Sequence, residues 1–429
     1  MAHIAVIGAG ITGITTAYNL ITRGHTVTVF ERHRYAAMET SFANGGQLSA
    51  SNAEVWNQLA TIAKGIKWLL KSDAPLLLNL KPSWHKYSWL AEFAAQIPHY
   101  RRNTIATVRL ALEARRALLA IAERENIAFD LERRGILHIY RDRKSFEHAS
   151  RVNVLLRQGG LERHAVDSKE IKAIEPAIHG DYYGGFYTPS DMTGDIHKFT
   201  TALADVCVRR GARLRCDAIV ERLAASARGV RVRWRAASGF GAPQESAADA
   251  VVICAGVASR HFAAMLGDRV NIYPVKGYSI TVTLEDSRSR AAAPWVSLLD
   301  DEAKIVTSRL GADRLRVAGT AEFNGFNYDI RDDRVRPLMR WTRQLFPDIA
   351  TERVVPWAGL RPMLPNMLPR VGRGRRARVF YNTGHGHLGW TLAAATAGMI
   401  GDIIDASLRP DGLCPRLATP AATAAGGRG

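Results

Sequence analysis

The sequence predicts an α/β protein with two lobes, one built on a parallel sheet flanked by helices and the other an α+β unit built on a mixed sheet. Three observations predict this class. The chain has 429 residues, which is more than one compact core usually holds. Its N-terminus has the order strand, glycine-rich turn, helix, strand. Further on, two kinds of composition alternate, which indicates that each lobe is built from separate stretches of chain.

The composition is that of a globular protein, with 47% hydrophobic and 23% charged residues, and it excludes general disorder, a collagen-like chain and a disulfide mini-protein. No stretch of about 20 uninterrupted apolar residues occurs, so we expect no membrane-spanning helix. The first residues have strand character and no basic region, so we expect no secretory signal. The four cysteines contain no Cys-x-x-Cys pair, which favours reduced thiols in a cytoplasmic protein.

Lysine and arginine number 58 against 40 acidic residues, which gives a net charge of +18. Such a balance is typical of proteins that bind nucleic acids or anionic membranes. The excess is mostly arginine spread along the chain, with no aromatic-interleaved RNA motif and no zinc-finger spacing, so we expect no nucleic-acid partner. Two interpretations remain: peripheral contact with the inner face of the cell membrane, and a solvated surface rich in arginine.

The N-terminal unit begins with an apolar strand, His3–Ile7, which has no polar face and is therefore typical of a parallel sheet covered on both sides. Gly8-Ala9-Gly10-Ile11-Thr12-Gly13 follows at once, then a helix and a second strand, Thr26–Phe30, that ends at Glu31. This is the order of a Rossmann βαβ unit that binds an adenine dinucleotide.

Each glycine of this motif has a physical role. Gly8 permits the tight turn from strand to helix, and Gly13 lets the helix pack closely on the strand. Gly10 has no Cβ, so a pyrophosphate approaches the helix N-terminus, where free N–H groups and the helix dipole favour anions. Glu31 accepts hydrogen bonds from the ribose hydroxyls. These features leave NAD and FAD both open.

After this unit the pattern changes to a small, polar, glycine-rich loop over 39–47, followed by a mainly helical stretch over 54–125. An α/β rhythm returns over 195–265, and its apolar strand Ala250–Cys254 ends in Ala255-Gly256. The other elements that we expect are strands near 135–140, 184–187, 212–216, 354–359 and 378–382, a strand-rich stretch over 271–325, and helices over 196–210, 332–346 and from about 389.

These changes in composition divide the chain into domains. We assign residues 1–50, 195–270 and 354–412 to the dinucleotide-binding domain, and residues 51–194 and 271–353 to a substrate domain. The dinucleotide-binding domain is thus discontinuous, with insertions that cover its ligand. Residues 413–429 are rich in Ala, Gly, Thr and Pro, and we expect a frayed tail there.

Further motifs follow the N-terminal unit along nearly the whole chain. They are Glu39-Thr40-Ser41 with Asn44-Gly45-Gly46-Gln47, Thr193-Gly194-Asp195, Tyr273 to Ser279 (YPVKGYS), Trp357 to Pro362 (WAGLRP) and Asn382 to Thr391 (NTGHGHLGWT). In these motifs the chain resembles the D-amino-acid oxidase superfamily of FAD enzymes, and most closely its bacterial D-amino acid dehydrogenase small-subunit branch. One departure occurs at Leu364–Pro369, where the family usually has Thr-Pro-Asp-Gly-x-Pro, so we expect an altered turn beside the flavin.

The resemblance implies that the cofactor is FAD, bound in a discontinuous Rossmann-type domain. The loop after Ser41 then lies along the flavin, and the glycines of the last motif let backbone N–H groups approach the ring edge that becomes negative on reduction. The cofactor residues that it implies are Ile7, Gly8, Ala9, Gly10, Ile11, Thr12, Gly13, Glu31, Arg32, Ser41, Asn44, Gly45, Gln47, Ala255, Gly256, Gly384, His385, Gly386, His387, Leu388, Gly389 and Thr391. A metal pair at His385 and His387 is the alternative for the last motif, but no carboxylate or cysteine nearby completes a site, so we expect no metal.

Arg361 is the residue that the resemblance implies for the substrate, because the family holds an amino acid carboxylate with the arginine of its Gly-Leu-Arg-Pro motif. A guanidinium makes two parallel charged hydrogen bonds to a carboxylate and so fixes its orientation. Tyr278 and, more weakly, Tyr273 are further candidates for the carboxylate or the amine, with a core aromatic as the alternative for both. Lys276 either hydrogen-bonds near the flavin or lines the surface.

The implied activity is FAD-dependent oxidative deamination of D-amino acids such as D-alanine to 2-oxo acids and ammonia, by hydride transfer from Cα to flavin N5. The electrons then pass to a quinone or another respiratory acceptor. The alternatives are an oxygen-using oxidase of glycine, sarcosine or a cyclic imino acid, and a flavin-binding protein without catalysis. The stretch 56–89, rich in Trp and Lys, fits either an anionic membrane surface or a lid over the substrate lobe. The sequence leaves the oligomeric state open.

Overall fold

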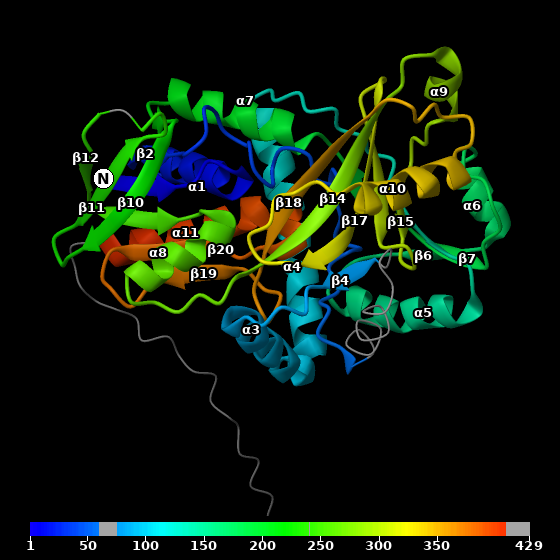
Figure 1. Cartoon of the computed structure of the whole chain (residues 1–429), viewed down its shortest axis with the longest axis horizontal. Coiled ribbons are helices and arrows are strands. Elements are labelled where there is room, and N and C mark those ends of the chain that lie inside the picture. The colour runs from blue at the N-terminus through cyan, green and yellow to red at the C-terminus, as the bar shows by residue number, and fades with distance from the viewer. Residues whose placement is uncertain (60–74, 240, 409–429) are drawn as a thin grey trace, which may run out of the picture.

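A computed structural model of the chain describes residues 1–59, 75–239 and 241–408. Two lobes, each built on a sheet, lie side by side along the long axis of the molecule (Figure 1). One lobe holds a six-stranded sheet and the other a nine-stranded sheet. The predicted tail over 413–429, and residues 60–74 of the stretch rich in Trp and Lys, lie outside the described residues.

The six-stranded sheet is the nucleotide-binding core that the N-terminal motif predicts. Its strand order is β19-β20-β13-β1-β2-β9, and every neighbouring pair is parallel except β19 with β20. The strands are β1 (His3–Ile7), β2 (Thr26–Phe30), β9 (Arg213–Arg215), β13 (Ala250–Ile253), β19 (Arg370–Arg373) and β20 (Val379–Thr383). The sheet therefore draws its strands from widely separated parts of the chain.

Both faces of this sheet are buried, which is why its strands are apolar throughout. Ile4 and Val6 of β1 face a layer of helices, whereas Ala5 and Ile7 face a small antiparallel sheet, as the two-residue period of a strand requires. The helices are α1 (Ile11–Thr22), α7 (Ile196–Arg209) and α11 (Gly389–Leu408). The small sheet consists of β10 (Ala218–Ala225), β11 (Val230–Ala236) and β12 (Gln244–Ala248), with α8 (Ser259–Met265) beside it.

The C-terminal helix α11 is long and apolar enough to cross a membrane by length and composition, over the window Gly386–Leu408. In this fold it packs against α1 and α4 (Tyr100–Arg124), and 56% of an 18-residue apolar stretch within that range is buried inside the protein. Its contacts are those of a core helix.

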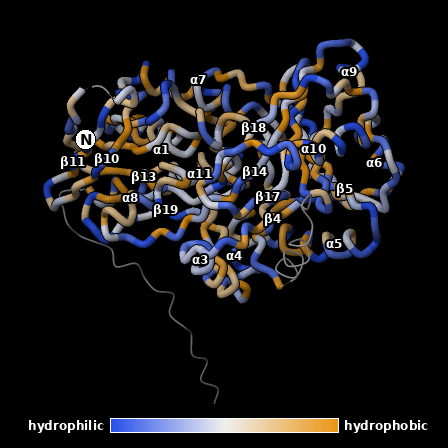
Figure 2. The backbone as a smooth tube through the Cα atoms, viewed as in Figure 1, coloured by the Kyte–Doolittle hydropathy of each residue, from blue (hydrophilic) through white to orange (hydrophobic). Residues whose placement is uncertain are grey.

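The nine-stranded sheet carries the second lobe and mixes parallel with antiparallel pairs. Its order is β18-β14-β17-β16-β15-β5-β7-β6, with β4 beside β17. α10 (Asp332–Leu345) covers one face through Val335, Leu338 and Trp341. Figure 2 shows hydrophobic residues along the interior strands of both lobes and hydrophilic residues on the outer loops. The strands are β4 (Leu76–Leu78), β5 (Ile136–Tyr140), β6 (His164–Val166), β7 (Gly184–Thr188), β14 (Tyr273–Thr283), β15 (Ser297–Asp300), β16 (Ile305–Leu310), β17 (Arg314–Phe323) and β18 (Val354–Met363).

The remaining elements connect or cover the sheets. They are β3 (Gln47–Leu48) paired with β8 (Met192–Thr193), α3 (Trp84–Ala95), α5 (Arg143–Gln158), α6 (Ser168–Ile174), α9 (Ser287–Ala292), and 3-10 turns over Ile97–His99, Gly256–Ala258 and Gly386–Leu388.

The predicted domain boundaries need one correction. Residues Val354–Met363, which we assigned to the dinucleotide-binding domain, form β18 and pair with β14 of the other lobe. The partner strand is distant in the sequence, so the local pattern did not reveal the pairing.

Candidate active site

A cavity of about 1150 Å³ lies where the two lobes meet and is lined by residues of both large sheets. Small-molecule pockets usually measure roughly 300–1,000 Å³. This cavity is therefore large enough for a bulky cofactor together with a small substrate. It passes the carboxyl ends of β1, β2 and β20, which is where open α/β sheets bind their ligands.

The glycine-rich turn after β1 has the geometry that its motif requires. Gly8 has a φ of 101°, in the left-handed region that favours glycine. A Cβ on Gly13 would lie 1.9 Å from the carbonyl oxygen of Gly8, so α1 approaches the turn too closely for any side chain. Gly10 is the N-cap of α1 and offers no side-chain cap, so the helix N-terminus is left facing the cavity.

Glu31 stands at the end of β2 and borders the same cavity. Its Oε2 accepts a hydrogen bond from Ala9 N at 2.7 Å, and its Oε1 accepts one from His33 N at 3.0 Å. These bonds fix the carboxylate beside the glycine turn. Each carboxylate oxygen accepts more than one hydrogen bond, so the group retains capacity for two ribose hydroxyls.

The loop over residues 41–47 bridges the two lobes. At one end Ser41 Oγ accepts a hydrogen bond from Ile11 N in the first turn of α1, at 3.0 Å. Further along, three successive carbonyl oxygens accept hydrogen bonds from side chains of the nine-stranded sheet. The donors are Ser279 on β14 (to Ala43 O, 2.7 Å), Arg316 on β17 (to Asn44 O, 3.1 Å) and Ser308 on β16 (to Gly45 O, 2.6 Å). The loop is thereby held as part of the cavity wall.

The last predicted motif forms the turn from β20 into α11. Gly384 and Gly386 have φ angles of 77° and 59°, so the backbone turns sharply beside the cavity. His385 Nε2 hydrogen-bonds Thr396 Oγ1 at 2.9 Å, which directs this buried side chain into α11. Burial lowers the pKa of His385 to about 3, because the charged imidazolium is disfavoured away from water. His385 therefore contributes its backbone to the cavity.

Arg361 lies on β18 and lines the cavity, with its guanidinium against the backbone of β14. A Cβ on Gly277 would lie 2.2 Å from Arg361 Nη2, so only glycine leaves room for the guanidinium at this position. Burial lowers the pKa of Arg361 to about 10, which still leaves the group charged at pH 7. Within the described part of the chain, no carboxylate forms an ion pair with it. The cavity thus holds a cation that is suited to a carboxylate ligand.

Thr320 has an unusual backbone that supports this arginine. Its φ is 61°, in the left-handed region that few non-glycine residues adopt. The register between β14 and β17 shifts at the same place, between Lys276 and Tyr278. Such a bulge takes a peptide group out of the ladder of the sheet, and here Thr320 O accepts a hydrogen bond from Arg361 Nη1 at 2.8 Å.

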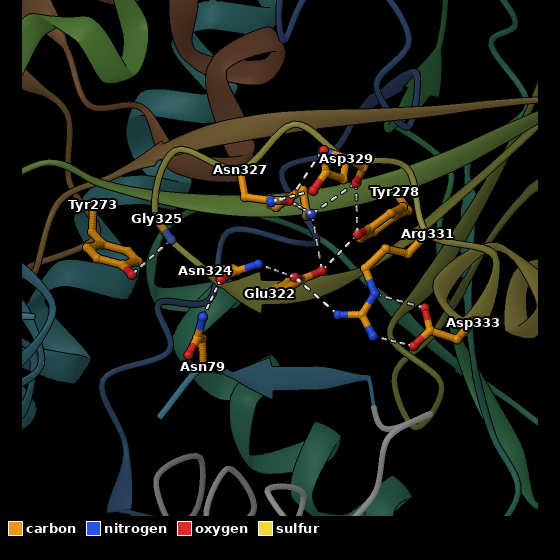
Figure 3. Close-up of polar contacts among 11 residues, drawn as sticks. Asn79, Tyr273, Tyr278, Glu322, Asn324, Gly325, Asn327, Asp329, Arg331 and Asp333 are labelled. Carbon is orange, nitrogen blue, oxygen red and sulfur yellow. Dashed lines mark hydrogen bonds and ion pairs between the residues drawn. The ribbon is translucent and has the colours of Figure 1, made fainter. Parts of the chain in front are cut away.

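Tyr273 does not line the cavity. Its hydroxyl accepts a hydrogen bond from Gly325 N at 3.1 Å, as Figure 3 shows, and its ring stacks on Phe323. It is a core aromatic with a satisfied hydroxyl, so the predicted contact with substrate is wrong for this residue. Tyr273 shares the face of Gly277 but lies four residues earlier on β14, where Trp89 and Phe323 surround it, and the sequence motif does not report these neighbours.

Tyr278 borders the cavity, but its hydroxyl donates to Glu322 Oε2 at 2.8 Å (Figure 3). Burial and this carboxylate raise the pKa of Tyr278. Because side chains alternate along β14, Tyr278 points away from the face on which Gly277 meets the guanidinium.

Lys276 lies on the same face of β14 as Tyr278. Its buried Nζ lies 3.5 Å from Glu322 Oε2 and donates a hydrogen bond to Asp329 O at 3.0 Å. Lys276 neither lines the cavity nor lies at the surface, and it anchors the segment that follows β17.

His387 also lines the cavity, and its imidazole stacks on Trp56 with ring centroids 4.8 Å apart. Its Nε2 lies 3.4 Å from Asn52 O, whereas its buried Nδ1 has no hydrogen-bond partner among the described residues. Burial and the positive charge of Arg361 lower the pKa of His387 to about 4. A buried polar atom without a partner costs roughly 1–3 kcal/mol.

Most of the predicted site residues meet at this one cavity. Those that line it are Ile7, Gly8, Gly10, Ile11, Thr12, Glu31, Arg32, Ser41, Asn44, Gly45, Gln47, Ala255, Gly256, Tyr278, Arg361, Gly384, His385, Gly386, His387, Leu388, Gly389 and Thr391. Ala9, Gly13 and Tyr273 do not line it. Gln47 lines it, but its side-chain amide donates to Ser297 Oγ at 2.7 Å, so that amide is already engaged.

Leu364–Pro369, where the chain departs from the family motif, forms a turn in which Met367 N donates to Leu364 O at 3.0 Å. Met367 stands where the usual motif has glycine, and its φ of 63° lies in the region that glycine favours. Asn366 Oδ1 accepts a hydrogen bond from Leu368 N at 3.2 Å, as the usual aspartate could. Met367 thus has a left-handed backbone although it is not a glycine, and the altered turn beside the flavin stays a prediction.

Several residues of the site were not predicted. Ser308 and Arg316 hold the loop 41–47, but serine and arginine in a region rich in strands carry no positional signal. Arg316 carried one weak signal of a special role, because it is a charged residue within a strand that is otherwise largely apolar. Trp56 was predicted only as part of the Trp-rich stretch, and the ring of His387 only as part of a backbone motif.

The residues of the cavity fit FAD. The helix N-terminus at Gly10 suits a pyrophosphate, the fixed carboxylate of Glu31 suits a ribose, and the turn after Gly384 presents backbone to the cavity, where it would hold the flavin ring. No group of three or more His, Cys, Asp or Glu side chains that could hold a metal ion occurs in the described part of the chain. His385 and His387 bond in different directions, to Thr396 and to Asn52.

Comparisons with known proteins agree with this assignment. The family described as FAD dependent oxidoreductase (DAO) matches residues 3–403. The chain is 62% identical over 412 residues to D-amino acid dehydrogenase 3 of Mesorhizobium japonicum, covering 96% of this chain and 99% of that protein. It is 42% identical to a D-amino acid dehydrogenase of Dechloromonas aromatica, covering 97% and 99%.

Solved structures show the same fold at low sequence identity. An L-proline dehydrogenase from P. horikoshii has a TM-score of 0.72 at 17% identity, covering 94% of this chain and 93% of that one. A glycine oxidase from Geobacillus kaustophilus has a TM-score of 0.71 at 21% identity, covering 98% and 100%. The predicted fold class is confirmed.

Proposed function

Because the chain belongs to the FAD dependent oxidoreductase (DAO) family, we propose that it is a D-amino acid dehydrogenase, which oxidises D-amino acids to 2-oxo acids and ammonia. The names of its relatives support this substrate class, since one of them is 62% identical along nearly its entire length. FAD is the cofactor, and the chain is an enzyme of the oxidoreductase class.

The observation that carries the proposal is the environment of Arg361. Its charged guanidinium lines the cavity, is kept in place by Thr320 O and the open backbone at Gly277, and has no ion-pair partner among the described residues. Such a group binds a carboxylate through two charged hydrogen bonds and desolvates it inside the cavity. An amino acid has this carboxylate next to the carbon that is oxidised.

The residues of the chain contribute mainly by positioning the substrate. Bound FAD supplies the acceptor for a hydride from Cα, at N5. Arg361 holds the carboxylate, which converts an encounter between substrate and cofactor into a fixed geometry. The walls around it, including Trp56 and Trp357, exclude water from the reacting carbon. The substrate must react with a neutral amine, whose lone pair supports the loss of hydride, and the resulting imine is hydrolysed by water.

For the electron acceptor we propose a quinone, reached by peripheral contact with the inner face of the cell membrane from the cytoplasm. An exposed apolar group at the start of α3 supports this contact: the Trp84 side chain is 85% exposed, and Leu80 and Tyr87 are also exposed beside Lys81. Aromatic and lysine side chains suit the interface of an anionic bilayer. The buried side of the same helix packs into the substrate lobe, where Trp89 Nε1 donates to Met363 O at 2.9 Å.

An anaerobic screen of flavin reduction tests the proposed reaction. The purified yellow enzyme is mixed with D- and L-amino acids, both prolines, glycine and sarcosine, and flavin absorbance is followed. D-alanine and other D-amino acids are expected to bleach the flavin. Bleaching by glycine or sarcosine alone, with peroxide formed in air, would instead identify an oxidase of those amines, and no bleaching by any of them would remove the catalytic proposal.

Liposome flotation tests the membrane contact. The enzyme is expected to float with vesicles that contain anionic lipid, and a Leu80→Ser, Trp84→Ser double variant is expected to stay in the dense fraction. A Trp295→Ser variant, which changes an exposed tryptophan elsewhere, is the control. If the wild-type enzyme stays in the dense fraction, this part of the proposal is wrong.

A further inference from the structure

Residues 51–58 follow the loop 41–47 and run along the wall of the cavity. Their exposure alternates strictly: the odd-numbered side chains are buried, whereas the even-numbered ones are only half-buried. The even-numbered side chains line the cavity, and they are Asn52, Glu54, Trp56 and Gln58. This is the two-residue period of an extended chain, so one face of the segment packs into the core and the other faces the cavity.

Hydrogen bonds fix this segment at both ends. At its start, the fully buried carboxylate of Asp191 accepts from Ala50 N and from Ser51 N, both at 3.0 Å. At its far end, the fully buried amide of Asn57 donates to Pro365 O at 2.9 Å. Pro365 lies just beyond the end of β18, so the segment is anchored beside the strand that carries the substrate-binding arginine.

A second link joins the cavity face of the segment to the same strand. The ring of Trp56 stacks on His387, with ring centroids 4.8 Å apart. The turn that holds His387 is paired with β18 through a bridge between His385 and Met363. Met363 and Arg361 occupy alternate positions of β18 and therefore share a face of the strand. The even-numbered side chains of the segment thus stand next to the place where Arg361 binds a carboxylate.

Glu54 is the acidic side chain of this face. Its Oε1 accepts hydrogen bonds from the hydroxyl of Tyr100, at 2.7 Å, and from the amide of Gln58. Its Oε2 has no hydrogen-bond partner among the described residues and is not buried, so it is accessible from the cavity that Glu54 lines. One oxygen therefore fixes the carboxylate in place, and the other is available to a ligand.

The other charged side chains at this end of the cavity are engaged or lie toward its outside. Lys304 forms an ion pair with Asp301. Asp142 caps the N-terminus of α5, and Lys144 and Arg151 of the same helix are exposed. The carboxylate on the segment 51–58 is thus an acid with a free oxygen inside the cavity.

The nucleotide motifs line one part of the cavity, which leaves the part lined by the segment 51–58 and α5 for the side chain of a substrate. We infer that Glu54 binds the positively charged end of a substrate side chain, so that the enzyme favours basic D-amino acids such as D-lysine and disfavours acidic ones such as D-glutamate. This inference rests on the proposed function. A carboxylate oxygen forms a charge-assisted hydrogen bond with an ammonium or guanidinium group, and it repels a second carboxylate.

A short side chain does not make this contact. D-alanine binds through its carboxylate alone and leaves the free oxygen of Glu54 to water. D-alanine is therefore a substrate of the enzyme, but one that lacks the additional stabilisation that a basic side chain receives.

The test compares ligands that differ only in a terminal ammonium group, on the flavin-loaded enzyme. Dissociation constants of 6-aminohexanoate and hexanoate, which have no α-amino group to be oxidised, are measured from the change in the flavin spectrum. In turnover, kcat/KM is compared for D-lysine and D-norleucine with a dye acceptor. Glu54→Gln removes the charge but keeps an oxygen that accepts from Tyr100. Glu147→Gln, at an exposed carboxylate of α5 that does not line the cavity, is the matched control.

The wild type is expected to bind 6-aminohexanoate about tenfold more tightly than hexanoate, the usual effect of one charged hydrogen bond. Glu54→Gln is expected to lose this preference while its affinity for hexanoate changes by less than about twofold. The ratio of kcat/KM for D-lysine over D-norleucine is expected to fall about tenfold in Glu54→Gln, and kcat/KM for D-glutamate to rise. Glu147→Gln is expected to keep the wild-type ratios. If the glutamine variant comes out colourless, Glu54→Met takes its place, with the same expected losses.

A preference for 6-aminohexanoate that is absent from the wild type, or that survives in Glu54→Gln, would overturn the inference. Equal weakening of both ligands in Glu54→Gln would show that Glu54 only supports the wall of the cavity, and would overturn it too. If the preference depends on Glu54 but no D-amino acid reduces the flavin, the proposed reaction fails while the contact at Glu54 stands. The two failures are therefore distinguishable.

Discussion

At the scale of single residues, the site depends on one charged side chain and on the space that a glycine leaves for it. Arg361 was predicted from a short motif that resembles a known family, and the structure places it in the cavity without an ion-pair partner among the described residues. The roles of Tyr273 and Tyr278 could not be predicted in the same way. A motif gives the order of residues, whereas the neighbours of each side chain come from distant parts of the chain: Glu322 binds the hydroxyl of Tyr278, and Phe323 stacks on Tyr273.

Replacing Arg361 tests its role. Arg361→Ala is expected to raise KM for D-alanine about 100-fold or more, because a charged clamp for the carboxylate is lost inside a partly dry cavity. Arg361→Lys keeps the charge but not the two parallel hydrogen bonds, so an intermediate KM is expected. Steady-state kinetics with a dye acceptor measure both. An unchanged KM in Arg361→Ala would assign the carboxylate to another residue.

Gly277→Ala tests the same site without touching the arginine. The new Cβ would lie 2.2 Å from Arg361 Nη2, so the guanidinium must move. We expect KM for D-alanine to rise about tenfold while the flavin stays bound. Gly398→Ala, at a helical position of α11 where no atom lies within 4 Å of the new Cβ, is the control. Equal kinetics in both variants would show that the guanidinium needs no such space.

At the scale of elements, local patterns predicted what local physics determines. The N-terminal strand, turn, helix and strand were predicted within a residue, because hydrophobic period and glycine spacing are sufficient there. The pairing of β18 with β14 was missed, because strand partners roughly 70–90 positions apart leave no trace in a short window of sequence. The attachment of the loop 41–47 to the other lobe was missed for the same reason, since its anchors lie on strands far along the chain.

Ser308→Ala tests this attachment. The hydroxyl of Ser308 donates to Gly45 O at 2.6 Å, and its loss frees one of the three carbonyl contacts of the loop. The dissociation constant for FAD is expected to rise about five- to tenfold, which corresponds to one hydrogen bond. Equilibrium titration of the stripped protein with FAD measures it. Ser226→Ala, which removes a hydroxyl from an exposed turn, should leave the constant unchanged; an equal rise there would mean that the effect is not local.

At the scale of the whole molecule, the prediction of two lobes with a discontinuous cofactor domain follows from chain order, and the six-stranded sheet agrees with it. The net charge of +18 did not identify a binding partner, because a total charge does not show how the charges are distributed over the surface. Many of the arginines form ion pairs with acidic neighbours at the surface, such as Arg288 with Asp348, which supports the solvated interpretation for part of the excess.

Stability in acid is a property of the whole fold, and buried histidines such as His385 contribute to it. The pKa of His385 is about 3 in the folded protein, against about 6.5 when unfolded. Between these values the unfolded chain binds a proton that the folded chain does not, so stability falls as pH decreases through this range. At pH 5 the contribution is about 2 kcal/mol.

His385→Asn is therefore expected to lose about 2 kcal/mol less stability than the wild type between pH 7 and pH 5. Denaturant unfolding at the two pH values measures this difference. His164→Asn, at an exposed histidine, should behave like the wild type. The same loss in the wild type and in His385→Asn would contradict a neutral, buried imidazole.

We propose that Arg361 holds the carboxylate of the substrate next to the flavin. A crystal structure of the flavin-loaded enzyme with benzoate tests it most directly. We predict both carboxylate oxygens about 3 Å from the Arg361 guanidinium, with the ligand between that group and the ring of the cofactor. Benzoate bound at another place, or a guanidinium that lies away from the ring, would contradict this role of Arg361.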